Sequence, residues 1–180
     1  MGHANPFTGQ IYDADIRVSA DFLRCMFNNM EYFIKPVSFD GQIAQDEDPL
    51  HEMHEATCKN GYACNYAAES AKEAAFGLAY ALANTGDLAD KDAITKEYVH
   101  SYLVELVAHE VGHTLGFRHN YKASTIYTLA QLQDPEFTRK YSTGGTVMDY
   151  TPPNLAGDAD KQGEFYASVP GPYDDWLIEY

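Results

Sequence analysis

The stretch "HEVGHTLGFRHN", residues 109–120, decides the fold of this chain. It contains three of the seven histidines in the 180 residues, and a glutamate follows the first of them. If the stretch is helical, His109 and His113 are just over one turn apart, so both imidazoles point to the same side, about 6 Å apart along the axis. Two nitrogens at that separation can bind one metal ion, so the spacing predicts a metal site on a helix.

Three further residues predict that this metal site is catalytic. Glu110 is rotated by about 100° from His109 around the helix, so its carboxylate can lie beside the ion without binding it, as a general base must. Gly116 can adopt the left-handed conformation that ends a helix, and the chain then turns back so that His119 supplies a third nitrogen. Three neutral imidazoles leave one position open for water, which is typical of a catalytic zinc site.

A purely structural explanation covers less of this pattern. Histidine is favoured near a helix C-terminus because its positive charge interacts with the helix dipole, but that accounts for one histidine only. It explains neither three histidines at this spacing nor the added glutamate and glycine. A metal site is therefore the better interpretation of residues 109–120.

The residues before the motif predict a long helix over 92–116, with Asp92 as its N-cap and Gly116 at its end. Apolar residues recur at every fourth position and predict the face that packs on the core. These residues are Val99, Leu103, Val107, Val111 and Leu115, with Tyr102 and Leu106 beside them.

The rest of the chain indicates a helix-rich α+β domain. Apolar and charged residues alternate over 11–19, which is typical of a strand with one buried face. Further helices are expected over residues 21–34, 65–86, 134–141 and 171–180. Asp134 is expected to cap the third of these, with Pro135 in its first turn.

The charge balance limits the class of partner. The chain carries 27 acidic and 12 basic side chains, a net charge of −15, which disfavours binding to nucleic acid or to an anionic membrane surface. No apolar run is long enough to span a membrane. The N-terminal stretch "MGHANPFTGQIYD" has no apolar core of a signal peptide, so we expect a domain excised from a longer protein.

The motif "HEVGHTLGFRH" resembles the zinc-binding motif of the metzincins, a clan of zinc endopeptidases. Their second mark is a turn containing methionine, the Met-turn, and "GTVMDY" places Met148 there. The sequence Met148-Asp149-Tyr150 resembles the turn of astacins and serralysins, whose tyrosine reaches the zinc side and stabilises the oxyanion. The resemblance implies that role for Tyr150. Asn120, which follows the third histidine, fits none of the well-known subfamilies.

Four stretches together resemble an uncharacterised bacterial family of predicted zinc metalloproteases, whose members are large exported proteins. They are "TGQIYDADIRV", "HEVGHTLGFRHNYKAST", "VMDYTPPN" and "GPYDDWLIEY". The resemblance implies export and one metzincin-like catalytic domain over 1–180. Its upper part, 1–118, would hold an edge strand and the active-site helix, and its lower part, 119–180, the third zinc ligand and the Met-turn. An excised chain would carry only part of the metzincin sheet.

These features predict a zinc-dependent endopeptidase with one zinc ion per chain. The expected zinc ligands are His109, His113 and His119. Glu110 would take the proton of the attacking water, and the peptide would lie extended along the edge strand at 11–19. Two alternatives stay open: a catalytically silent zinc-containing binding module, and a zinc hydrolase of a non-protein amide. The sequence does not indicate an oligomeric state.

Two other candidate features carry weaker signals. The stretch "DADKQG", 158–163, has the oxygen-ligand spacing that begins a calcium loop, but Val169 stands where the closing glutamate is expected. Cys58 and Cys64 are near enough in sequence to close a small loop if the protein is exported, and reduced thiols are the alternative.

Overall fold

A computed structural model describes residues 2–18, 20, 23–24, 26–29, 66–85 and 88–180. The chain divides into two compact units, which are described separately: Met1–Val18 with Ala81–Tyr180, and Ser19–Tyr80. The helix-rich α+β class predicted from the sequence is confirmed. The single catalytic domain with an upper and a lower part stays a prediction.

The central element of the first unit is helix α4, Leu88–Thr114, which is 27 residues long. It begins before the predicted position, so Asp92 lies inside the helix and the prediction that it is the N-cap was wrong. The predicted end is confirmed, because Gly116 has a φ of +89°. The amides of Gly116 and Phe117 donate to the carbonyls of His113 (3.1 Å) and Gly112 (3.0 Å), which is the Schellman ending of a helix.

The buried face of α4 differs from the one predicted. Val107, Val111 and Leu115 are 40%, 40% and 48% exposed, so the predicted apolar face was wrong along this end of the helix. Tyr102, which was predicted beside that face, is buried as expected. The other buried residues recur at helical spacing on the face that contains Tyr102: Tyr98, Ser101, His109 and Gly112. The buried polar side chains of this face bind the backbone of irregular segments: Ser101 contacts the Tyr166 amide and His109 the Val147 carbonyl.

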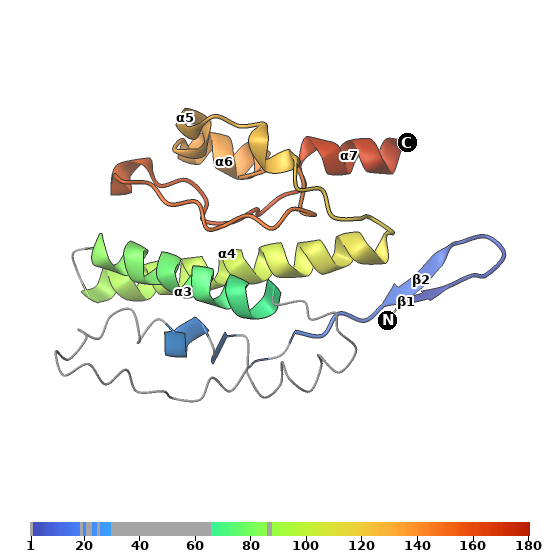
Figure 1. Ribbon diagram of the computed structural model, residues 1–180, viewed down its shortest axis with the longest axis horizontal. Coiled ribbons are helices and arrows are strands. Elements are labelled where there is room, and N and C mark those ends of the chain that lie inside the picture. The colour runs from blue at the N-terminus through green and yellow to red at the C-terminus, as the bar shows by residue number, and fades with distance from the viewer. Residues whose placement is uncertain (1, 19, 21–22, 25, 30–65, 86–87) are drawn as a thin grey trace. The chain divides into compact units, whose positions relative to one another are not determined.

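Irregular segments that follow α4 in sequence return along this face, as Figure 1 shows in orange. The Tyr98 and Tyr166 hydroxyls are 2.9 Å apart, and the Tyr166 amide donates to Ser101 Oγ at 3.1 Å. Residues 142–149 are buried without forming a helix or strand. Their backbone groups need partners that no sheet supplies in the described part of the chain, so side chains supply them.

Three short α-helices follow α4 in the first unit: α5 (Leu129–Leu132), α6 (Pro135–Tyr141) and α7 (Pro172–Glu179). Two 3-10 helices, η2 (Ala123–Thr125) and η3 (Ala159–Lys161), lie between them. The predicted cap of α6 is confirmed, since Asp134 accepts hydrogen bonds from the amides of Glu136 and Phe137 at 3.0 and 3.3 Å. The predicted helix over 171–180 corresponds to α7.

The sheet of the first unit is an antiparallel hairpin of β1 (Gly2–Ala4) and β2 (Ile11–Ala14). The strand predicted over 11–19 is therefore shorter than expected. All four β2 residues are exposed, so the expected buried face was wrong. A hairpin of this size has too few residues to cover a core within the described part of the chain.

The second unit contains most of α3, Tyr66–Ala83, which confirms the helix predicted over 65–86. Its small residues form one buried face with Leu78: Ala71, Ala74 and Ala75. Of the helix predicted over 21–34, the described residues between 20 and 29 are helical. Cys58 and Cys64 lie outside the described residues. None of the described helices is long and apolar enough to cross a membrane.

Candidate metal centre

Three imidazole nitrogens converge at the end of α4. The Nε2 atom of His119 lies 3.2 Å from Nε2 of His109 and 3.1 Å from Nε2 of His113. In the described residues, these three histidines are the group of His, Cys, Asp or Glu side chains that can hold one ion. The predicted convergence of three histidines is confirmed, and the Gly116 turn brings the third one back.

The outer nitrogen of each imidazole has a partner that orients the ring. Nδ1 of His109 lies 2.7 Å from the Val147 carbonyl oxygen, and Nδ1 of His113 lies 3.1 Å from that of Phe117. A carbonyl oxygen only accepts, so these two Nδ1 atoms carry the hydrogen and each Nε2 presents its lone pair to the centre. This donor set fits zinc, which prefers imidazole nitrogen.

Electrostatics at the centre favour the neutral imidazoles that a metal requires. Burial lowers the pKa of His109 below its usual value, against the raising effect of its contact with Val147. Burial also lowers the pKa of His119, and the neighbouring His113 adds to the effect. Both shifts favour the neutral form of the His109 and His119 rings over the imidazolium form.

Glu110 lies beside the cluster on α4 and is half-buried. Its negative charge acts on both His109 and His119, since it opposes the lowering of their pKa values. Its role as the general base stays a prediction.

The Tyr150 ring covers the cluster from the side of the Met-turn. Its hydroxyl oxygen lies 2.6 Å from Nε2 of His119, and its ring stacks on that of His109 with centroids 4.9 Å apart. The hydroxyl is therefore a neighbour of any ion bound at the same nitrogen. Tyr121 contacts His119 from the other edge, with its hydroxyl 3.2 Å from Nδ1.

Met148 lies fully buried against α4, where Gly112 leaves room for it. A Cβ atom at position 112 would overlap the Met148 sulfur. The Met148 carbonyl accepts the amide of Asn120 at 3.0 Å, which ties the turn to the residue that follows the third histidine. The sequence interpretation overlooked Gly112, although glycine inside a helix is a signal of close approach.

Two buried carboxylates that the sequence interpretation also missed hold the Met-turn. Asp174 of α7 accepts the amides of Val147 (3.0 Å) and Gly171 (2.8 Å) and the hydroxyl of Thr146. Asp149 accepts the amides of Tyr150 (2.8 Å) and Ser124 (3.0 Å). Asp149 stands in a polar loop and Asp174 in the first turn of a short helix, and neither position gives a sequence signal that the carboxylate will be buried.

A third carboxylate that the sequence interpretation missed is that of Glu105, a half-buried residue of α4 one turn before His109. Oε1 of Glu105 accepts the Thr151 hydroxyl at 3.2 Å and the Ala167 amide at 3.4 Å. Burial raises the pKa of Glu105 to about 7, against the lowering effect of these two hydrogen bonds.

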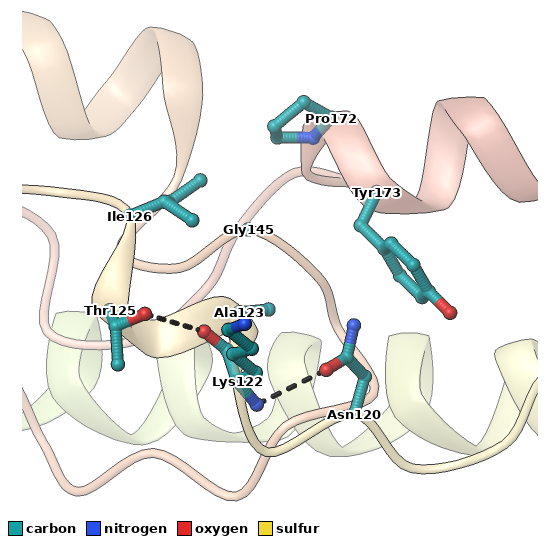
Figure 2. A pocket seen from close by; sticks show the side chains of 8 residues that line it. All are labelled: Asn120, Lys122, Ala123, Thr125, Ile126, Gly145, Pro172 and Tyr173. Atoms are coloured by element: carbon teal, nitrogen blue, oxygen red, sulfur yellow. Dashed lines mark hydrogen bonds between the residues drawn. The ribbon is translucent and has the colours of Figure 1, made fainter.

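A pocket of about 340 Å³ begins at Asn120, the residue after the third histidine (Figure 2). Pro172 and Tyr173 of α7 face Ile126 across it, and Gly145 lies between them (Figure 2). The remaining lining residues are Lys122, Ala123 and Thr125. The volume is at the lower end of the range of ligand sites.

The calcium loop considered at 158–163 is not supported. Asp158 pairs with Lys161, whose Nζ lies 3.5 Å from its carboxylate, and it also accepts the Asp160 amide at 3.2 Å. The described residues hold no second cluster of possible metal ligands beside the histidines.

Comparison with known proteins identifies one match. A family model described as Met-zincin matches residues 91–180, which is half of the chain. The matched part contains all three histidines of the centre, together with Glu110 and Met148. No curated protein and no solved structure matches the chain.

Proposed function

Because the chain belongs to the Met-zincin family, we propose that it is a zinc-dependent endopeptidase with zinc held by His109, His113 and His119. The observation that carries the proposal is the convergence of three Nε2 atoms, two of them on rings whose Nδ1 atoms are held by backbone carbonyls. Zinc in such a site supplies Lewis acidity, which lowers the pKa of water to about 7 and polarises a carbonyl group.

Glu110 is the proposed general base. It is adjacent in sequence to the proposed ligand His109, it lies on the same helix as two ligands, and its negative charge acts on His109 and His119. In the proposed reaction Glu110 takes a proton from the attacking water and passes it to the nitrogen of the leaving amine. The peptide bond breaks and the new carboxylate keeps the oxygen of the water.

Tyr150 is the proposed donor to the carbonyl oxygen of the substrate. Its hydroxyl lies at the edge of the histidine cluster, and stacking on His109 holds the ring there. As the carbonyl oxygen gains negative charge, a hydroxyl already in position stabilises it without reorganisation.

The substrate of this proposal is an extended peptide. In the described part of the chain β2 pairs with β1 alone, so its second edge presents backbone groups that a peptide can bind as an added strand. Residues of a strand are about 3.3 Å apart, so a side chain a few residues from the cleaved bond can enter the pocket that begins at Asn120. Export of the protein remains part of the proposal.

The test combines metal analysis with digestion of an unfolded protein. We expect about one zinc ion per chain, and cleavage that a chelator abolishes. Glu110→Gln should keep the zinc and lose at least a hundredfold in kcat, in line with the usual contribution of a general base. His100→Gln, which changes an exposed histidine of the same helix, should change neither.

Each outcome distinguishes the proposal from its alternatives. Retained cleavage by Glu110→Gln would remove the general base from the mechanism. Bound zinc without cleavage of any unfolded protein would favour a silent binding module or a hydrolase of another amide. Well-folded protein that binds no zinc would overturn the metal site itself.

A further inference from the structure

Glu105 contacts the segment that immediately follows Tyr150. Its Oε1 atom accepts the hydroxyl of Thr151, the next residue in the chain, and the amide of Ala167. The same carboxylate therefore joins α4 to two irregular segments at positions sixteen apart in the sequence, 151 and 167. Nothing in the proposed reaction uses this carboxylate.

The other side of Tyr150 is also held by a carboxylate. Asp149 Oδ1 accepts the Tyr150 amide at 2.8 Å, while Oδ2 accepts the Ser124 amide at 3.0 Å. Tyr150 is thus fixed at its own amide by Asp149 and at the following residue by Glu105. These two attachments leave the backbone at position 150 little freedom to rotate the ring away from His109.

A glutamate at position 105 is less favourable for stability than a neutral residue that could accept the same hydrogen bonds. A glutamine could accept the same two hydrogen bonds through its amide oxygen, without a charge to bury. Burial and the nearby Asp149 both raise the pKa of Glu105, so both oppose its ionised form. Residues that lower the stability of the fold are typical of functional sites.

We propose that Glu105 is a positioning residue for Tyr150: by holding Thr151 against α4, it keeps the Tyr150 ring over His109 and the hydroxyl beside His119. The inference rests on the proposed function, because the position matters for a hydroxyl that must meet a substrate oxygen. A displacement of about 1 Å at such a group can lower the rate by two orders of magnitude.

Ser101 provides a matched control. It lies one turn before Glu105 on the same face of α4, and its Oγ accepts the amide of Tyr166, next to Ala167. Ser101→Ala therefore loosens the same returning segment without touching Thr151. A merely structural role of Glu105 would make the two substitutions equivalent.

The first experiment is a kinetic double-mutant cycle. We expect Glu105→Ala to lower kcat by roughly tenfold with KM changed less than about twofold, and Glu105→Gln, which keeps an acceptor for Thr151, to restore most of the rate. In a Tyr150→Phe background, Glu105→Ala should cause no further loss. Equal losses in both backgrounds, or an equal loss in Ser101→Ala, would overturn the inference.

The second experiment needs no activity and uses the metal-free protein. Amide hydrogen exchange at Tyr150 should become at least tenfold faster in Glu105→Ala and stay unchanged in Ser101→Ala. Glu105→Gln serves if the alanine variant does not fold, and it should show exchange close to that of the parent. If the parent cleaves nothing while Tyr150 shows this response, the proposed function fails and the positioning stands. An unchanged Tyr150 amide in Glu105→Ala refutes the positioning.

Discussion

Substitution of Gly112 by alanine should destabilise the protein, although alanine is the better helix former. Gly112 lies inside α4 between two of the histidines, and an added Cβ atom would overlap the sulfur of Met148. Met148 has no exposed surface, so its side chain cannot move out into solvent to make room. The backbone of the Met-turn must shift instead, or the side chain must leave its favoured rotamer.

The expected magnitude follows from two opposing effects. Replacing glycine with alanine in a helix interior stabilises by about 1 kcal/mol. Overpacking of a filled core costs about 1–3 kcal/mol, and the upper end applies here because the overlap is deep and Met148 is enclosed. The free energy of unfolding should therefore fall by about 2 kcal/mol.

Removal of the Met148 side chain should reverse the sign of the effect of Gly112→Ala on the free energy of unfolding. Met148→Ala alone costs about 2–5 kcal/mol, because it leaves a cavity at a fully buried position. In that background the new Cβ at position 112 has free space, so Gly112→Ala should stabilise by about 1 kcal/mol. The coupling between the two substitutions is then about 3 kcal/mol, which is large for a pair of residues.

Urea unfolding of the four proteins in metal-free form measures this coupling, and the slopes must agree for the energies to be compared. Zinc affinity provides an independent readout, since the Met148 carbonyl holds the Asn120 amide next to the third ligand. Gly112→Ala that stabilises the parent, or an effect of the same sign in both backgrounds, would show that Met148 does not pack against α4 as described.

Three other predictions concern pH, metal and the support of the Met-turn. Since burial raises the pKa of Glu105 from its usual 4.5 to about 7, the folded state keeps a proton there that the unfolded state loses between these pH values. The free energy of unfolding of the parent, measured relative to that of Glu105→Gln, should thus fall by up to about 3 kcal/mol as the pH rises from 4.5 to 7. Urea unfolding at a series of fixed pH values measures this difference, and a difference that does not change with pH would show that the carboxylate is solvated. Chelation of zinc should lower Tm reversibly in the parent and leave the Tm of His113→Ala unchanged, as calorimetry can measure. Asp174→Ala should cost about 3–5 kcal/mol because two buried amides and a hydroxyl lose their acceptor, whereas Asp175→Ala on the exposed side of α7 should cost less than about 0.5 kcal/mol in the same urea assay.

The sequence predicts the metal centre well because the centre is built from local rules. Helical spacing places His109 and His113 together, and the left-handed conformation of Gly116 brings His119 back within three residues. Capping rules likewise predict the start of α6 at Asp134. These relations span less than about four helical turns, so no knowledge of the distant chain is needed.

The support of the centre depends on contacts between distant segments and is not predictable in the same way. Apolar periodicity indicated Val107 and Val111 as core residues, but the returning segments pack on the neighbouring face instead. The amides of Tyr166 and Ala167 in these segments need acceptors, and Ser101 and Glu105 supply them. A hydrophobicity pattern predicts which apolar side chains are buried. It does not predict which polar side chains are buried because they form hydrogen bonds with backbone groups.

The strand at 11–19 shows a second limit. Alternation of apolar and charged residues predicts a strand with one buried face. That face is buried only if another layer of the protein packs on it. In the described part of the chain β2 ends at Ala14 and its side chains are exposed. The period of two was therefore correct for the conformation of Ile11–Ala14 and wrong for its environment.

The Schellman ending of α4 has a consequence for the order of folding. All three imidazoles lie within eleven residues (109 to 119), and a tight turn joins them, so closing the ring of ligands costs little chain entropy. The Met-turn, by contrast, must return across a loop of 38 residues to meet His109. The three ligands can therefore come together through local structure alone, without the distant segments. The contacts of Val147 and Tyr150 with the histidines need the distant segments to have returned, so they involve a larger closure entropy than the ligand cluster itself.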